Sequence, residues 1–266
     1  MDNKIIIYTA ITGGYDALPQ PYLPAEGFRF ICFVEKGAKK ADRDGAWEIE
    51  EIPYEWPDMT LLARSQKLNP HTVLPDSSVW SLWIDGNIRI KDDSLYRICR
   101  ELQSRDVKMA GIRHPFNDCA YKETEKCLLG RRESLCKLLR VVKFLRKNNL
   151  PEHAGLMETN VIFRKHNDPL VVEFDRWWWE CLVKYSNRDQ LTQTFCLRDT
   201  EGLECGYLFP EGISARNFDG LEYVRHPTEK LTWLERKLKY GMNRPELLIL
   251  RSYIRLTRPK NNRQTL

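Results

Sequence analysis

Short β-branched runs alternate with amphipathic helical segments in the first half of the chain, and this alternation restricts the fold more than any other feature. Strand-like runs cover residues 4–11 ("KIIIYTAI"), 28–35 and 46–54, and a segment with helical spacing of its leucines follows at 58–69. Strands and helices that alternate in this way are typical of a largely parallel sheet with helices on both faces. We therefore predict a single α/β domain.

The alternation continues into the second half of the chain. A helix is predicted at 131–147, where basic residues and leucines repeat with helical spacing, and we interpret it as a surface helix or a lid. The three consecutive tryptophans at 177–179 lie in another predicted helix and are expected mainly in the core. The remaining predictions are strands at 81–90, 107–112 and 159–165 and helices at 92–103 and 168–186.

The positive charge of the chain is concentrated at its C-terminal end. Residues 230–266 contain ten Lys and Arg against two Glu, a net charge of +8, so the preceding residues carry −3 of the total of +5. We predict a domain at 1–229 and a basic helical extension at 230–266, with two helices broken near Gly241 and Pro245. Such a segment favours an anionic membrane surface or phosphorylated glycans as a partner. The alternatives are a solvated helix face, or packing on the main domain or on a second subunit. The apolar residues available for such contacts are Trp233, Leu247, Leu248 and Ile254.

Composition restricts the compartment and the partners. The chain is 42% hydrophobic with a mean hydropathy of −0.53, and its N-terminal apolar run is too short for a signal peptide or a membrane span. The eight cysteines form no CxxC pair, so we interpret them as reduced packing residues. The basic tail contains no nucleic-acid recognition motif. We expect a cytoplasmic protein, at the inner face of the membrane if the tail binds lipid, that does not bind nucleic acid.

The stretch "SLWIDGNIRI" at 81–90 places polar residues within a strand-like run. Asp85 and Asn87 flank Gly86, and in open α/β sheets ligands bind at the carboxyl ends of strands. A tight turn of this kind offers a carboxylate, an amide oxygen and a backbone that can approach a diphosphate. An ordinary turn, in which Asp and Gly satisfy local backbone groups, is the alternative interpretation.

Several motifs in a fixed order resemble those of a known family. The sequence contains "ITGGYD", "SLWIDGN", "RHP" followed by "CAYKE", "ETNVIFRKHN" and "SNRDQL", spread over about residues 4–230. In this order they resemble the glycosyltransferase-like domain family of bacterial polysaccharide clusters and plant Golgi proteins, which is similar to the GT-A nucleotide-sugar transferases. The resemblance implies a GT-A-like fold and transfer of a sugar from a nucleoside-diphosphate sugar to a glycan or lipid-linked acceptor. A non-catalytic module that binds a nucleotide sugar or a glycan on the same fold is the alternative.

The resemblance implies a metal site around the Asp-Gly-Asn turn. GT-A enzymes use an Asp-x-Asp element to bind a divalent cation and the diphosphate, and here Asp85 and Asn87 occupy the corresponding positions, with an amide in place of the second carboxylate. His226 and Lys230 resemble the late His and Lys that meet the metal and the phosphates. Mg²⁺ or Mn²⁺ is the expected cofactor, and imidazole suits Mn²⁺ better. The single carboxylate predicts a weakened metal site.

Donor binding is expected at the end of the first strand and on the following helix. The resemblance implies that backbone groups near Thr9 and Ala10 bind the base of a UDP- or GDP-sugar, while Tyr15 stacks on it. Arg64 and Lys67 lie three residues apart on one helix face, so both can point at one anion. A solvated helix face is the alternative for this pair.

The acceptor and catalytic residues are expected later in the chain. The resemblance suggests acceptor binding by a polar group that follows the strand at 107–112, consisting of Arg113, His114, Tyr121 and Glu123. Asp189 is the first choice for an anionic group near the anomeric carbon, although with Ser186 it also matches a helix capping box. Glu158 or Glu123 is the candidate general base if the reaction inverts configuration.

Overall fold

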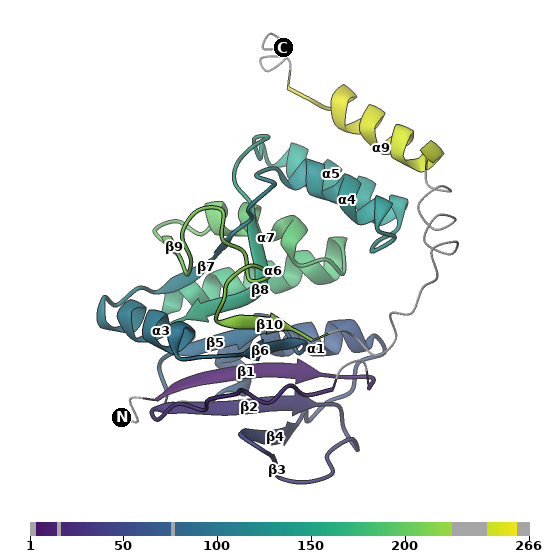
Figure 1. The fold of residues 1–266 in the computed structure, drawn as a ribbon. Coiled ribbons are helices and arrows are strands. Elements are labelled where there is room, and N and C mark those ends of the chain that lie inside the picture. The colour runs from purple at the N-terminus through teal and green to yellow at the C-terminus, as the bar shows by residue number, and fades with distance from the viewer. Residues whose placement is uncertain (1–3, 15–16, 76–77, 225–243, 260–266) are drawn as a thin grey trace.

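An eight-stranded sheet forms the centre of the molecule (Figure 1). The computed structural model describes residues 4–14, 17–75, 78–224 and 244–259. The strand order is β3-β4-β2-β1-β5-β8-β7-β9, and β8 is antiparallel to both of its neighbours. Four pairs are parallel, namely β1 with β2, β1 with β5, β2 with β4, and β7 with β9. The strands are β1 (Ile5–Ile11), β2 (Phe28–Val34), β3 (Arg43–Asp44), β4 (Trp47–Glu51), β5 (Ser81–Ile84), β7 (Met109–Arg113), β8 (Met157–Arg164) and β9 (Cys205–Tyr207).

Alternating side chains of β1 enter two separate cores, one on each face of the sheet. Ile6 and Tyr8 belong to the core beneath the helices α1, α4, α5, α6, α7 and α9. Ile5 and Ile7 belong to the core beneath α3 and a small second sheet formed by β6 and β10. This period of two is what a strand buried on both faces requires, and the predicted α/β class is confirmed.

The helices and the small sheet occupy the following ranges. The longest helix is α6, which carries the three tryptophans, and of these Trp178 is fully buried. The helices are α1 (Met59–Leu68), α2 (Pro70–Val73), α3 (Ser94–Ser104), α4 (Ala120–Leu129), α5 (Leu135–Lys147), α6 (Pro169–Tyr185), α7 (Gln190–Asp199) and α9 (Arg244–Leu256), and the small sheet pairs β6 (Ile88–Ile90) with β10 (Leu221–Tyr223).

Two sequence-based expectations need adjustment. The run 81–90 is not one strand, because the chain turns at 85–87 and leaves the main sheet, so β5 ends at Ile84 and β6 pairs elsewhere. The basic helix predicted from residue 131 begins at Leu135, where the Ser134 hydroxyl accepts a hydrogen bond from the Lys137 N–H. This helix is not a lid, because Leu138, Val142 and Leu145 are fully buried in the core.

The described part of the C-terminal extension packs on the main domain. Helix α9 lies beside α4 and α5 and inserts Leu247, Leu250 and Ile254 into the same core (Figure 1). Arg251 pairs with Glu125 of α4 at 2.7 Å. Residues 225–243, which include Trp233 and the predicted boundary at 229/230, lie outside the described residues. The inner face of α9 therefore packs on the main domain, as one of the predicted alternatives requires, and the outer face carries exposed residues.

None of the described helices combines the length and the apolar character that a membrane span needs.

Candidate functional site

The turn after β5 packs directly against the end of β1. A Cβ atom added to Gly86 would lie 3.0 Å from Ile11 Cγ1 and 3.6 Å from the Ala10 carbonyl oxygen. Only glycine permits this approach without displacement of Ile11. Thr9 is 1% exposed, and its hydroxyl has no hydrogen-bond partner among the described residues. The predicted nucleotide-binding residues Thr9 and Ala10 therefore adjoin the Asp-Gly-Asn turn, whereas Tyr15 lies outside the described residues.

Asp85 is held by its backbone, and its side chain remains accessible. Its N–H donates to the Asn160 carbonyl of β8 at 2.9 Å, and its own carbonyl accepts from the Ile88 N–H at 2.9 Å. The side-chain Oδ1 accepts from Trp83 Nε1 at 2.8 Å and lies 3.5 Å from Lys67 Nζ. The side chain of Asp85 is 41% exposed, so it does not pack in the core. Sequence reasoning missed Trp83, although its position two residues before Asp85 on the same strand face could have indicated the contact.

A buried ion pair lies next to Asp85. Lys67 Nζ is 2.5 Å from Asp189 Oδ2, and the two side chains are 4% and 5% exposed. Arg64 Nε lies 3.9 Å from the other oxygen of Asp189. The predicted convergence of Arg64 and Lys67 on one anion is observed, and in this structure the anion is Asp189. Lys67 thus places a cation between the carboxylates of Asp85 and Asp189.

Asp189 stays ionised despite its burial. Burial alone would raise the pKa of this carboxyl, but the charges of Lys67, Arg64 and Arg188 outweigh it and hold the pKa below its usual range. Asp189 Oδ1 also accepts from the Gln190 N–H at 3.0 Å and caps α7. The predicted capping box with Ser186 as N-cap does not form, because Ser186 ends α6 and α7 begins only at Gln190. Negative charge at a helix N-terminus is favourable.

The core fixes the end of α1 that carries Lys67. The Lys67 carbonyl accepts from Arg164 Nη2 at 2.7 Å and from the Tyr8 hydroxyl at 3.3 Å. Arg164 is itself fully buried and pairs with Asp175 of α6 at 2.6 Å. At the other end of α1, the Asp58 side chain accepts from the backbone N–H groups of residues 60 and 61. The position of Lys67 therefore depends on a buried arginine that the sequence analysis did not single out.

Glu158 contributes to a polar wall on the β8 side of Asp85. Its Oε2 accepts from the Ala215 N–H at 3.1 Å. Asn160, two residues along the same strand face, donates to the Tyr223 hydroxyl, and Arg216 stacks on the Tyr223 ring at 4.3 Å. Burial, followed by the charge of Asp85, raises the pKa of Tyr223, so this phenol stays protonated at neutral pH. The sequence analysis predicted Glu158, but it missed Asn160, Arg216 and Tyr223.

The four predicted acceptor residues divide into two groups. Arg113 and His114 lie where β7 ends, at the edge of the sheet that also carries Asp85. Arg113 stacks on Tyr207 of β9 at 4.3 Å and pairs with Glu211 at 3.1 Å. Burial lowers the pKa of His114, although the charges of Glu123 and Glu158 oppose the shift.

The other two residues are internal. Glu123 is 3% exposed and accepts from the Asn117 amide at 2.9 Å. Tyr121 is 1% exposed, donates to the Leu150 carbonyl at 2.8 Å and lies under Arg146. Tyr121 therefore packs between α4 and α5, and its predicted role in acceptor binding is wrong because its side chain is not accessible. Both residues lie on the inner side of α4, a helix that the sequence analysis did not predict, so their burial was not foreseen.

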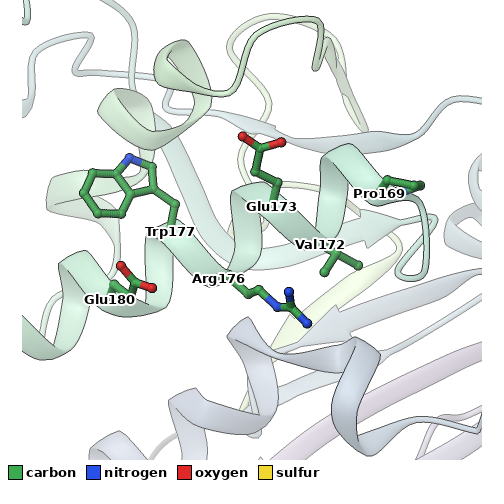
Figure 2. A pocket seen from close by; sticks show the side chains of 6 residues that line it. All are labelled: Pro169, Val172, Glu173, Arg176, Trp177 and Glu180. Carbon is green, nitrogen blue, oxygen red and sulfur yellow. The ribbon is translucent and has the colours of Figure 1, made fainter.

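A hollow on the outer face of α6 is distinct from this cluster (Figure 2). It has a volume of about 460 Å³, and all of its lining residues come from α6. Figure 2 shows Trp177 and Glu173 projecting to one side of the helix and Arg176 to the other. Neither Asp85, Lys67 nor Asp189 lines this hollow. We locate the candidate site at the carboxyl edge of the strands because charged groups converge there.

The side chains of the Asp-Gly-Asn turn could hold a divalent cation only together with a bound ligand that supplies further oxygen atoms. Asp85 and Asn87 supply one carboxylate and one amide, and no group of three His, Cys, Asp or Glu that could hold a metal ion occurs in the described ranges. Mg²⁺ commonly binds through one or two carboxylates together with substrate phosphates. The predicted ligand His226 and the predicted phosphate contact Lys230 lie outside the described residues.

A largely parallel α/β sheet with charged groups at its carboxyl edge places the candidate site where ligands bind in open α/β folds. The family model described as "TOD1/MUCI70, glycosyltransferase-like domain" matches residues 1–203, and the chain belongs to this family. The resemblance inferred from the order of the motifs is thereby confirmed.

One solved structure gives a more distant comparison. The crystal structure of mouse xyloside xylosyltransferase 1 in its apo form aligns over 77% of this chain and 83% of that chain, with 11% sequence identity and a TM-score of 0.41. No curated protein matches the chain.

Proposed function

We propose that this protein is a GT-A-like glycosyltransferase that moves a sugar from a nucleoside-diphosphate sugar to a glycan or lipid-linked acceptor. The observation that carries the proposal is the placement of Asp85. Its accessible carboxylate lies at the carboxyl end of β5, against the end of β1 and beside the Lys67–Asp189 pair. Membership of a glycosyltransferase-like family supports the same conclusion.

The donor is proposed to lie across the ends of β1 and β5. The backbone at Thr9 and Ala10 contacts the base, and Gly86 lets the turn that carries Asp85 pack closely against this backbone. Asp85 and Asn87 hold a Mg²⁺ or Mn²⁺ ion together with the diphosphate of a UDP- or GDP-sugar. When bound, the cation neutralises the negative charge that develops on the leaving diphosphate.

Lys67 and Asp189 are proposed to act on the donor sugar. A glycosyl transition state carries positive charge on the sugar and negative charge on the leaving group, so an ordered ion pair can stabilise both. Both oxygens of Asp189 already accept hydrogen bonds or face cations. This favours an electrostatic role for Asp189 and leaves Glu158, near the predicted acceptor residues Arg113 and His114, as the candidate general base.

The test uses the purified full chain and a panel of UDP- and GDP-sugars, with Mn²⁺ and with EDTA. We expect calorimetry to detect binding of at least one nucleotide sugar, and we expect slow hydrolysis or transfer of its sugar. Both should be lost in Asp85→Ala. Asp93→Asn, a change to an exposed carboxylate at the start of α3, is the control and should keep both activities.

The outcomes separate the enzyme from a binding module. Full turnover by Asp85→Ala would remove Asp85 from the mechanism. Nucleotide binding that needs neither Mn²⁺ nor Asp85, with no turnover on any donor, would instead identify the non-catalytic module. Analysis of the anomeric configuration of the product by NMR then tests Glu158, because a general base acting on the acceptor hydroxyl gives inversion.

A further inference from the structure

Helices α5 and α9 lie side by side and run in the same direction. Glu246 near the start of α9 lines the same hollow as Ser134 and Leu135 at the start of α5. Near the other ends, Arg146 of α5 donates to the Ile254 carbonyl of α9 at 3.1 Å. These two contacts fix the register and the relative direction of the helices.

One flank of α9 carries exposed aliphatic side chains beside α5. Residues 246, 249, 253 and 256 form one row along a helix, and Glu246 places this row on the α5 side. Within the row, Ile249 is 53% exposed and Leu256 is 75% exposed. Leu248, which is 64% exposed, lies on the other flank of α9, next to Arg251. Three large aliphatic side chains therefore face solvent on a helix whose opposite face is in the core.

The outer face of α5 carries only positive charge. Arg140, Lys143 and Lys147 repeat at helical spacing and are all exposed. The segment Leu135–Lys147 contains no acidic residue. On the helix this row lies next to Leu139 and Arg146, which are on the α9 side. We call the combined patch the α5–α9 surface; it consists of Arg140, Lys143, Lys147, Ile249 and Leu256.

We propose that the α5–α9 surface binds a bilayer that contains anionic lipids. Aliphatic side chains on a helix lying flat can enter the interface, while neighbouring cations stay at the headgroups. Each Lys or Arg near an anionic bilayer strengthens binding roughly fivefold. Protein interfaces are enriched in aromatic anchors, whereas Tyr253, the aromatic residue of this row, packs partly against the core and the exposed apolar members are aliphatic. The proposal is independent of the transferase function, although membrane binding would hold such an enzyme near a lipid-linked acceptor.

The experiment is vesicle flotation of the full chain. Vesicles of phosphatidylcholine alone are compared with vesicles that contain 30% phosphatidylserine, at roughly 0.1 and 0.5 M NaCl, between which screening increases strongly. We expect recovery with the anionic vesicles, little recovery with the neutral ones, and a marked decrease at high salt. No binding to anionic vesicles would overturn the proposal.

Two sets of variants locate the contact. The cation set is Arg140→Gln, Lys143→Gln and Lys147→Gln together, and it should weaken binding by on the order of 100-fold. Its control makes the same change at three exposed lysines on the far side of the sheet, Lys36→Gln, Lys40→Gln and Lys91→Gln.

The aliphatic set separates a bilayer from a soluble polyanion. Ile249→Ser with Leu256→Ser should weaken flotation at least about tenfold, because apolar burial is lost while the charge is unchanged. Leu23→Ser with Val183→Ser, at exposed aliphatic residues on other surfaces, is the control. Circular dichroism and the melting temperature check folding of every variant. Equal recovery of the test and control sets would refute the assignment of this surface.

Discussion

Replacement of Lys67 by Met tests whether the buried ion pair is both a structural and a functional element. The Lys67 ammonium lies 2.5 Å from Asp189, and both side chains are almost completely buried. The substitution preserves most of the side-chain volume and removes the charge. It leaves Asp189 ionised in a site that excludes water.

The size of the effect follows from this geometry. Removal of one partner from a buried ion pair costs about 3–5 kcal/mol, because the remaining charge is uncompensated. Arg64 still lies 3.9 Å from Asp189, and the Gln190 N–H still donates to it, so we expect the lower end of this range, about 3 kcal/mol. For a chain of this length, that corresponds to a decrease of roughly 6–12 °C in Tm.

Urea and thermal unfolding of a double-mutant cycle provide the measurement. Asp189→Asn keeps an oxygen that can cap α7, so Lys67→Met with Asp189→Asn removes both charges and should be more stable than Lys67→Met alone. Both Lys67→Met variants should nevertheless lose donor binding. Lys40→Met, at an exposed position, is the control for the loss of a lysine.

Two results would refute this reasoning. Strictly additive effects in the cycle would show that Lys67 and Asp189 do not interact energetically. Wild-type donor binding by the stable double variant would show that the pair serves the fold alone.

Two further predictions concern a buried histidine and the glycine of the turn. His166 is fully buried, and burial, followed by the charge of Arg164, lowers its pKa from 6.5 to about 4. Because the unfolded chain binds this proton below pH 6.5 and the folded chain only below about pH 4, the free energy of unfolding should decrease by about 3 kcal/mol as pH falls between these values. Urea unfolding of His166→Gln should show a flatter pH dependence, and an unchanged slope would contradict the assignment. Gly86→Ala should weaken donor binding in calorimetry because its Cβ meets Ile11 Cγ1 at 3.0 Å, and Ile11→Ala, which removes that atom, should restore it. Wild-type affinity of Gly86→Ala would argue against a need for this close approach of the turn to β1.

The β-branched runs and helical spacings determined the class of fold from the sequence alone. An apolar run such as Ile5–Ile11 is buried on both faces in any sheet that helices cover, so its pattern does not depend on distant residues. The same local logic identified the helix at 58–69 and its Arg64–Lys67 row. Sequence reasoning also singled out Asp85, because a polar turn after a buried strand lies at the carboxyl end of the sheet, where ligands bind in open α/β folds.

Tertiary structure decided which charges meet. Lys67 and Asp189 are 122 residues apart in the sequence, and only the packing of α1 against the start of α7 shows that one neutralises the other. Long-range packing likewise placed Tyr121 in the core and the inner face of α9 against α4 and α5. A charged or aromatic residue looks the same in the sequence whether its partner is solvent or a buried neighbour, because burial depends on elements that are distant along the chain.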